Sequence, residues 1–205
     1  AAVIGFGSGM TTHALLCNER LSRVDTIEIE PAMVEAASFF RPAVERAYTD
    51  PRGAVHLEDA KTFFSTRVRT YDLIVSEPSN PWVSGVASLF SEEFYRLIRH
   101  HLNPGGVFAQ WVQLYEIDLD LVGSILKAIA ANFPDYAVYA TNRGDVLVAA
   151  SRDGAVPEVD AGVFREPALS ALLRRIHVED PQDLRLRKIG TKRGWAKLLR
   201  TFPLP

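Results

Sequence analysis

The 205 residues include 47% apolar and 23% charged side chains, with 23 Lys and Arg against 25 Asp and Glu and a formal net charge of −2. This composition excludes disordered and fibrous proteins, and no apolar run approaches the roughly 18 residues that a membrane-spanning helix needs. Cys17 is the one cysteine, which excludes a disulfide framework and a cysteine-based zinc site and fits a reducing compartment, here the cytoplasm.

Strands and helices alternate through the first 150 residues. In chain order, the predicted strands cover residues 3–5, 24–28, 55–57, 73–75, 107–112, 136–140 and 146–150, and the predicted helices cover residues 10–19, 31–46, 60–64, 91–101 and 119–131. Pro31 suits the first turn of its helix, and the Asn-Pro-Gly-Gly stretch at 103–106 ends another. This alternation predicts an α/β fold with a Rossmann-like, doubly wound, mostly parallel sheet.

After residue 157 the pattern changes to helices only. The predicted helices cover residues 168–176, 181–188 and 195–199. We therefore expect a nucleotide-binding domain over residues 1–153 and a helical C-terminal extension over 154–205. The extension shows no residues that suggest chemistry.

Charge is unevenly distributed along the chain. Residues 1–162 contain 13 basic and 21 acidic side chains, whereas residues 163–205 contain 10 and 4. Seven basic residues and no acidic one lie between 185 and 200. We interpret this stretch as a solvated helix face, with a patch for nucleic acid or anionic headgroups as the alternative.

The ends of the sequence suggest a fragment of a longer polypeptide. It opens inside an apolar strand at Ala1 and stops at Pro205 without a charged tail. We therefore expect flanking regions, with a membrane segment among the candidates.

A glycine loop, Gly5-Phe6-Gly7-Ser8-Gly9, follows the first strand and opens a helix. Glycines let the backbone approach a ligand closely, and a helix N-terminus favours an anionic or acceptor-rich group. Glu28 follows 19 residues after Gly9, at the end of the next strand. A carboxylate there can accept both hydroxyls of a ribose, so the pattern predicts a nucleoside site.

Glu58, Asp59 and Ala60 end the third strand. In a parallel sheet, ligands bind beyond the carboxyl ends of the strands. A carboxylate at that position can accept from the exocyclic amine of adenine while the next backbone N–H serves the ring nitrogen. Asp59 is equally suited to cap the helix that follows, and the two roles are compatible.

These features occur together in the class I S-adenosylmethionine fold. Three further segments, residues 71–81, 89–95 and 102–107, resemble the spermidine synthase (polyamine aminopropyltransferase) family. The resemblance covers about residues 1–115 and is greatest to the spermidine-synthase-like domains that follow a membrane region in some bacterial proteins.

The resemblance implies roles for individual residues. Gly5, Gly7 and Gly9 match the glycine loop, Glu28 the ribose acid, and Glu58, Asp59 and Ala60 the adenine end. Glu77 falls where the family has its catalytic aspartate, and Asn80 where a second aspartate helps to hold the amine. Ser79 and Trp82 are expected in the substrate pocket.

Three positions depart from the family pattern. Ser8 replaces an aspartate that pairs with the aminopropyl ammonium of decarboxylated S-adenosylmethionine, Glu77 is longer by one methylene, and Asn80 lacks a charge. A dicationic diamine should bind less well to such a pocket.

The resemblance favours aminopropyl transfer to a small amine, with Glu77 as general base and Asn80 orienting the acceptor. A methyltransferase that uses intact S-adenosylmethionine is the alternative, because Ser8 tolerates the co-substrate carboxylate and Asn80-Pro81-Trp82 is similar to the loop of enzymes that methylate amino groups. A non-catalytic nucleoside-binding module is the third hypothesis. A homodimer is a further expectation. The five histidines show no ligand spacing, so no metal is expected.

Overall fold

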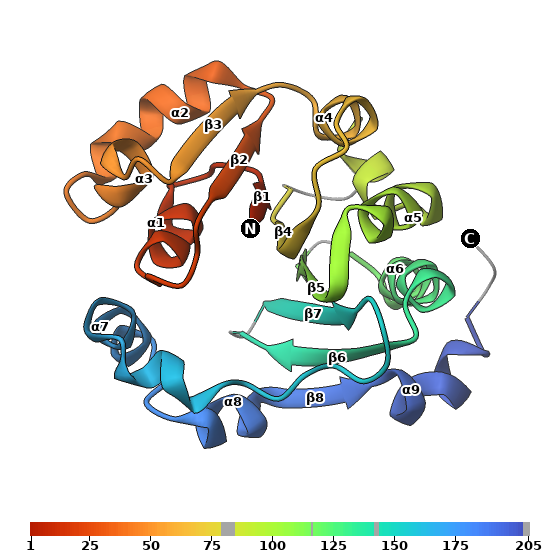
Figure 1. Cartoon of the computed structure of the whole chain (residues 1–205). Helices are drawn as coiled ribbons and strands as arrows, with labels where there is room; N and C mark the ends of the chain where they lie inside the picture. Colours follow the sequence, from red (N-terminus) through yellow and green to blue (C-terminus); the bar gives the residue numbers. More distant parts are fainter. Residues whose placement is uncertain (79–84, 116, 142–143, 203–205) are drawn as a thin grey trace. The chain divides into compact units, whose positions relative to one another are not determined.

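The structure, a computed structural model, describes residues 1–78, 85–115, 117–141 and 144–202. The chain divides into two compact units, coloured along the sequence in Figure 1. Unit 1 comprises Ala1–Thr66 with Glu158–Leu186, and unit 2 comprises Arg67–Pro157 with Arg187–Pro205. Both units combine helices with a sheet, which confirms the predicted α/β class.

Unit 1 contains a parallel three-stranded sheet in the order β3-β2-β1. Its elements are β1 (Ala2–Ile4), α1 (Met10–Leu16), β2 (Val24–Glu28), α2 (Pro31–Ala37), η1 (Ser38–Phe40), α3 (Arg46–Thr49), β3 (Gly53–Leu57), α4 (Ala60–Thr66), η3 (Ala161–Arg165), α7 (Pro167–Arg175) and most of α8 (Pro181–Arg187). β1 and β2 are buried along their whole length. Their apolar side chains form the centre of this unit, as the predicted strands require.

Unit 2 contains a mixed sheet in the order β4-β5-β7-β6-β8. Its elements are β4 (Tyr71–Ser76), η2 (Val86–Phe90), α5 (Glu92–His100), β5 (Leu102–Gln113), α6 (Leu119–Asn132), β6 (Asp135–Ala140), β7 (Asp145–Ser151), β8 (Lys188–Thr191) and α9 (Lys192–Leu199). β4 and β5 are parallel, whereas the pairs β5–β7, β7–β6 and β6–β8 are antiparallel. The expected closing pair of strands is thus confirmed as β6 and β7.

An aromatic cluster forms the core of unit 2 beneath α5 and α6. Phe108 on β5 stacks on Phe133 at 5.7 Å between ring centroids and meets Tyr95 of α5 at 5.7 Å. All three side chains are almost completely buried. Burial raises the pKa of the Tyr95 hydroxyl well above its usual range, because the surroundings disfavour a phenolate.

The long helix predicted over residues 31–46 is wrong. α2 ends at Ala37, one turn of η1 follows, and α3 begins only at Arg46. Pro42 explains the break, because a proline disfavours helical geometry in the residue before it, and Arg41 is extended (φ −64°, ψ 144°).

Two other expectations need correction. Residues 188–191 form β8, so the expectation that only helices follow residue 157 is wrong at this point. β5 begins at Leu102 and not at residue 107, and the register of its pairing with β4 shifts between Tyr71 and Leu73, opposite the Asn-Pro-Gly-Gly stretch.

No helix in the parts of the chain that the structure describes is both long and apolar enough to cross a membrane.

Candidate active site

The glycine loop of unit 1 adopts the backbone geometry that its sequence predicts. Gly5, Gly7 and Gly9 have φ angles of 94°, 49° and 79°, values that side chains rarely allow. A Cβ atom on Gly9 would lie 3.1 Å from the Phe6 ring, whereas one on Gly7 would meet nothing within 4 Å. The loop is therefore tightly packed at Gly9, where α1 begins, and open at Gly7. Ser8 lies between them in the turn, partly exposed.

The buried side chain of Phe6 holds the glycine loop in place. Its side chain is buried with Ala37 and Ala47, and its ring meets Tyr48 edge-on at 5.5 Å. The Gly9 amide donates to the Phe6 carbonyl at 2.8 Å, which closes the turn. This apolar packing fixes the backbone of the loop and leaves its other side open, as a ligand-binding turn requires.

Glu28 lies at the carboxyl end of β2 and is 9% exposed. Its Oε2 accepts from the Phe6 amide at 2.9 Å, and its Oε1 accepts from the Glu30 amide at 2.9 Å. A carboxylate has about four acceptor sites. Each oxygen therefore keeps one for a ligand, and the pair of amides holds the carboxylate in one orientation. This geometry suits two neighbouring hydroxyls of a ribose.

The carboxyl end of β3 lies beside that of β2. The Glu58 amide donates to the Glu28 carbonyl at 3.0 Å, so the hydrogen bonding between the strands continues one residue past the end of β3. Asp59 caps α4, since its Oδ1 accepts from the Thr62 amide at 2.9 Å and from the Thr62 hydroxyl at 3.1 Å. The capping role of Asp59 is confirmed. Ala60 follows as the first, buried residue of α4.

Exposed apolar side chains flank these acids, and they are not among the site residues predicted from the sequence. Ile29 directly follows Glu28 and is 69% exposed, and Leu57 at the end of β3 is 58% exposed. Exposed apolar side chains beside oriented polar groups can pack against a planar ring. An apolar residue immediately after the acid that ends a strand is the sequence signal that would have identified Ile29.

The second group of predicted residues lies in unit 2. Glu77 directly follows β4 and is partly buried. Ser79, Asn80 and Trp82 lie outside the described residues. The structure therefore gives the strand end from which this loop starts, and Glu77 is the one predicted catalytic residue that it describes.

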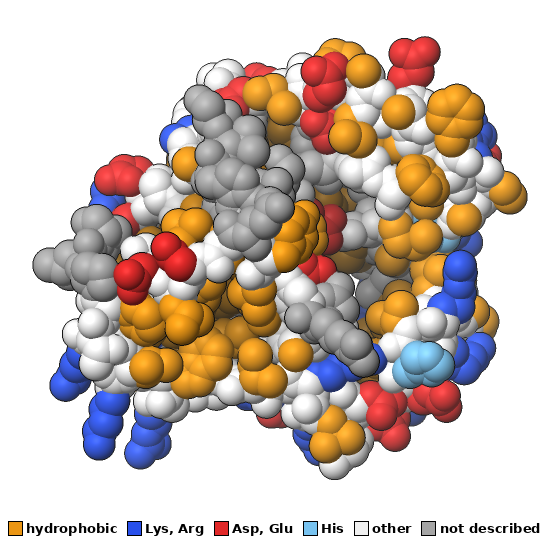
Figure 2. Space-filling model, turned by 180° about the vertical axis from the view of Figure 1, so that it is seen from behind, with side chains coloured by type: hydrophobic (Ala, Val, Ile, Leu, Met, Phe, Trp, Pro, Cys, Tyr) orange, Lys and Arg blue, Asp and Glu red, His pale blue; other side chains and the backbone are white. Residues whose placement is uncertain are grey.

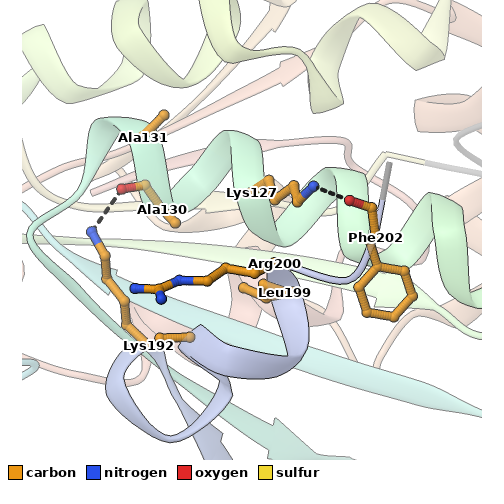
Figure 3. Close-up of a pocket in the computed structure, with 8 residues that line it drawn as sticks. Lys127, Ala130, Ala131, Lys192, Leu199, Arg200 and Phe202 are labelled. Carbon is orange, nitrogen blue, oxygen red and sulfur yellow. Dashed lines mark hydrogen bonds between the residues drawn. The ribbon is translucent and has the colours of Figure 1, made fainter. Parts of the chain in front are cut away.

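A groove of about 520 Å³ opens in unit 2 between α6 and α9. It combines apolar side chains with cationic ones, shown in Figure 3: Lys127, Ala130, Ala131, Lys192, Ala196, Leu199, Arg200 and Phe202.

Two of the groove lysines have a structural role. The ammonium of Lys192 donates to the carbonyls of Ala130 and Phe133, both at 2.7 Å, and so caps the end of α6. Lys127 donates to the Phe202 carbonyl at 2.6 Å. These bonds fasten the C-terminal segment to α6.

Basic side chains also gather on the outer face of α9, at the lower left of Figure 2. Arg193 and Lys197 of α9 are exposed, as is Arg200, which directly follows the helix. This arrangement fits the expected solvated helix face. Among the described residues, no group of three or more His, Cys, Asp or Glu side chains could hold a metal ion.

Comparison with solved structures defines the class of the fold. A spermidine synthase in complex with the transition-state analogue AdoDATO superposes with a TM-score of 0.71 and 21% identity over 80% of this chain and 58% of that chain. Human methyltransferase-like protein 13 in complex with SAH gives a TM-score of 0.64 and 22% identity, over 84% of this chain and 81% of that one. The chain thus has the class I methyltransferase-like α/β fold.

Sequence comparison assigns the chain to a family within this fold class. Residues 1–143 match the family model of the spermine/spermidine synthase domain, and the chain belongs to this family. The polyamine aminopropyltransferase of Caldicellulosiruptor saccharolyticus is 28% identical over 138 residues, which are 67% of this chain and 49% of that protein. The enzyme of the same name from Nitrosomonas europaea is 34% identical over 114 residues, 55% of this chain and 35% of that protein. The chain therefore spans half or less of the length of these relatives.

Proposed function

We propose that the chain carries the nucleoside-binding and catalytic part of an aminopropyltransferase that uses decarboxylated S-adenosylmethionine and a small amine. The observation that supports this most directly is the oriented Glu28 carboxylate beside the open turn of the glycine loop, in a chain of this family. Glu28 would accept the ribose hydroxyls, Gly5, Gly7 and Gly9 would admit the co-substrate, and Asp59 with Ala60 would serve the adenine.

In the proposed reaction, the amine nitrogen attacks the methylene next to the sulfonium. The new C–N bond forms as the C–S bond breaks, and the neutral thioether leaves with the bonding electron pair. An alkylammonium has a pKa of about 10, so a base must accept its proton. Glu77 would accept that proton, and Asn80 would orient the acceptor, with Ser79 and Trp82 in the same pocket.

A methyltransferase that uses intact S-adenosylmethionine is the second candidate. It is supported by Ser8, which occupies the glycine loop without a negative charge, and by the fold shared with a methyltransferase in complex with SAH. An acidic residue at this position would repel the carboxylate of intact S-adenosylmethionine.

Calorimetry with the two co-substrates and with 5′-methylthioadenosine separates these functions. We expect tighter binding of decarboxylated S-adenosylmethionine, and a clear preference for the intact form would refute the aminopropyltransferase. Binding of none of the three would leave a non-catalytic module.

Glu77→Gln tests the base. We expect kcat to fall by about 100-fold or more, because general base catalysis contributes roughly 10²- to 10⁴-fold, with little change in co-substrate affinity. Glu93→Gln, on α5, is the control for loss of one glutamate charge in unit 2. Full activity of Glu77→Gln would remove this residue as the base.

A homodimer and a cytoplasmic location stay predictions.

A further inference from the structure

Gln110 occupies an unusual position in the middle of β5. Its side chain is fully buried, at 0% exposure. The amide nitrogen Nε2 donates to the Ser76 carbonyl at 3.3 Å and to the Trp111 carbonyl at 2.9 Å. Both hydrogens of the amide are thereby engaged, so the side chain is held in one orientation across the end of β4.

Ser76 is both the last residue of β4 and the strand partner of Gln110. Val75 pairs with Ala109, and Ser76 with Gln110 is the final pair of the ladder, after which the chain continues into Glu77. β5 itself extends three residues further, to Gln113. The Gln110 amide thus reinforces the last point at which β4 is attached to its neighbour.

Apolar packing alone does not account for a glutamine here. In the described part of the chain, Oε1 of Gln110 and Oγ of Ser76 are both buried without a hydrogen-bond partner. Burying an unpaired polar atom destabilises the folded state. A methionine has a similar length and volume, and it would fill the same space without an unpaired acceptor.

We propose that Gln110 is a positioning residue for the catalytic loop. Its amide fixes the carbonyl of Ser76 and thereby the backbone from which Glu77 projects. This inference rests on the proposed function, in which Glu77 accepts the proton of the amine. A displacement of the reacting group by about 1 Å costs on the order of 100-fold in rate. Fixing the end of β4 would therefore maintain the rate by keeping Glu77 in position.

Gln110→Met tests the proposal, because it removes both donated hydrogen bonds and keeps the packing. We expect kcat to fall by about 10- to 100-fold, with the KM for the nucleoside co-substrate unchanged and a melting temperature within a few degrees of wild type. Loss of stability in proportion to loss of activity would instead indicate a purely structural role and overturn the proposal.

Phe108→Leu is the matched control. Phe108 lies two positions earlier on the same face of β5, is fully buried, contacts the rings of Tyr95 and Phe133, and pairs with Ile74, two residues before the end of β4. We expect this variant to melt at a lower temperature and to keep its kcat. If it loses as much kcat as Gln110→Met, general loosening of unit 2 explains both, and the proposal fails.

Hydrogen exchange gives a readout that does not depend on turnover. In Gln110→Met, amide exchange in a peptide covering residues 73–77 should rise about tenfold or more, while exchange in β6 and β7 stays at the wild-type level. Unchanged exchange in residues 73–77 would overturn the positioning role. If wild-type protein transfers no aminopropyl group, the proposed function fails, and the exchange result still decides whether Gln110 holds the end of β4.

Discussion

Glu28 combines a structural role with a proposed binding role in a single side chain. Its two oxygens accept the amides of Phe6 and Glu30, so the carboxylate joins the glycine loop to the end of β2. The same bonds orient the acceptor sites that remain. The sequence predicted the position of this acid from its spacing after Gly9, but not the two amides, because they come from residues whose side chains carry no signal.

We predict that Glu28→Gln weakens binding of 5′-methylthioadenosine by about 10- to 100-fold. A glutamine has one acceptor oxygen, and its NH₂ group would face a backbone N–H, so one charge-assisted bond of roughly 1.5–3 kcal/mol is lost. Calorimetry measures the change.

Glu30→Gln is the control for that experiment. Glu30 lies two residues away and caps α2 through the Ala32 amide, and a glutamine oxygen can still accept that bond. We expect wild-type affinity for this variant. Equal affinities of Glu28→Gln and wild type would show that the Glu28 charge does not contribute to the site.

Asp59 illustrates a residue with two compatible interpretations. Its Oδ1 accepts from the Thr62 amide, and the carboxylate therefore has a structural reason to be there. The adenine role stays a prediction. Local sequence alone could establish the cap, because an N-cap depends only on the next three residues.

Among the elements, α2 and the C-terminal segment show where periodicity misleads. Apolar spacing up to Phe40 predicted one helix over residues 31–46. Phe40 is, however, 57% exposed, and the chain turns before Pro42. Residues 188–191 are too short and too polar to indicate a strand by themselves. Their two β-branched residues, Ile189 and Thr191, lie on either side of Gly190. They form β8 because β6 offers an edge with unpaired backbone groups.

Gly190 allows β8 and α9 to pack closely. A Cβ atom at this position would overlap the ring of Trp195. We predict that Gly190→Ala lowers the free energy of unfolding by about 1–3 kcal/mol, as other overpacked contacts do, and that it raises hydrogen exchange in β6. Denaturant unfolding gives the first quantity.

Ile189→Ala is the comparison for that variant, because Ile189 neighbours Gly190 on β8 but is 50% exposed. Its loss should be about 1 kcal/mol or less. If Gly190→Ala is no more destabilised than Ile189→Ala, the Trp195 ring has room to move, and the glycine is not required.

At the level of the whole chain, the described residues proposed to bind the nucleoside all belong to unit 1, whereas Glu77 and the groove between α6 and α9 belong to unit 2. We predict that saturating 5′-methylthioadenosine slows hydrogen exchange in the glycine loop and at the ends of β2 and β3. Ligand binding stabilises the segments that it contacts. Exchange in β8 and α9 should not change.

Exchange mass spectrometry over the full chain provides that map, with adenine-free 5′-methylthioribose as the control ligand. Protection concentrated at Lys127, Lys192 and Arg200 in place of the strand ends would contradict the assignment of the site.

The sequence by itself determined the α/β class, the glycine loop, the acid that follows it, and membership of the spermine/spermidine synthase family. These features depend on local spacing and on short motifs, which a single chain displays directly. The expected division at residues 153 and 154 stays a prediction.

The tertiary structure decided which groups fix Glu28, that β8 joins the sheet of unit 2, and that Gln110 holds the end of β4. Each of these depends on contacts between residues far apart in the chain: Phe6 with Glu28, β8 with β6, and Gln110 with Ser76. Side-chain periodicity carries no information about such partners, because they are selected by packing and by the hydrogen bonds that burial makes obligatory.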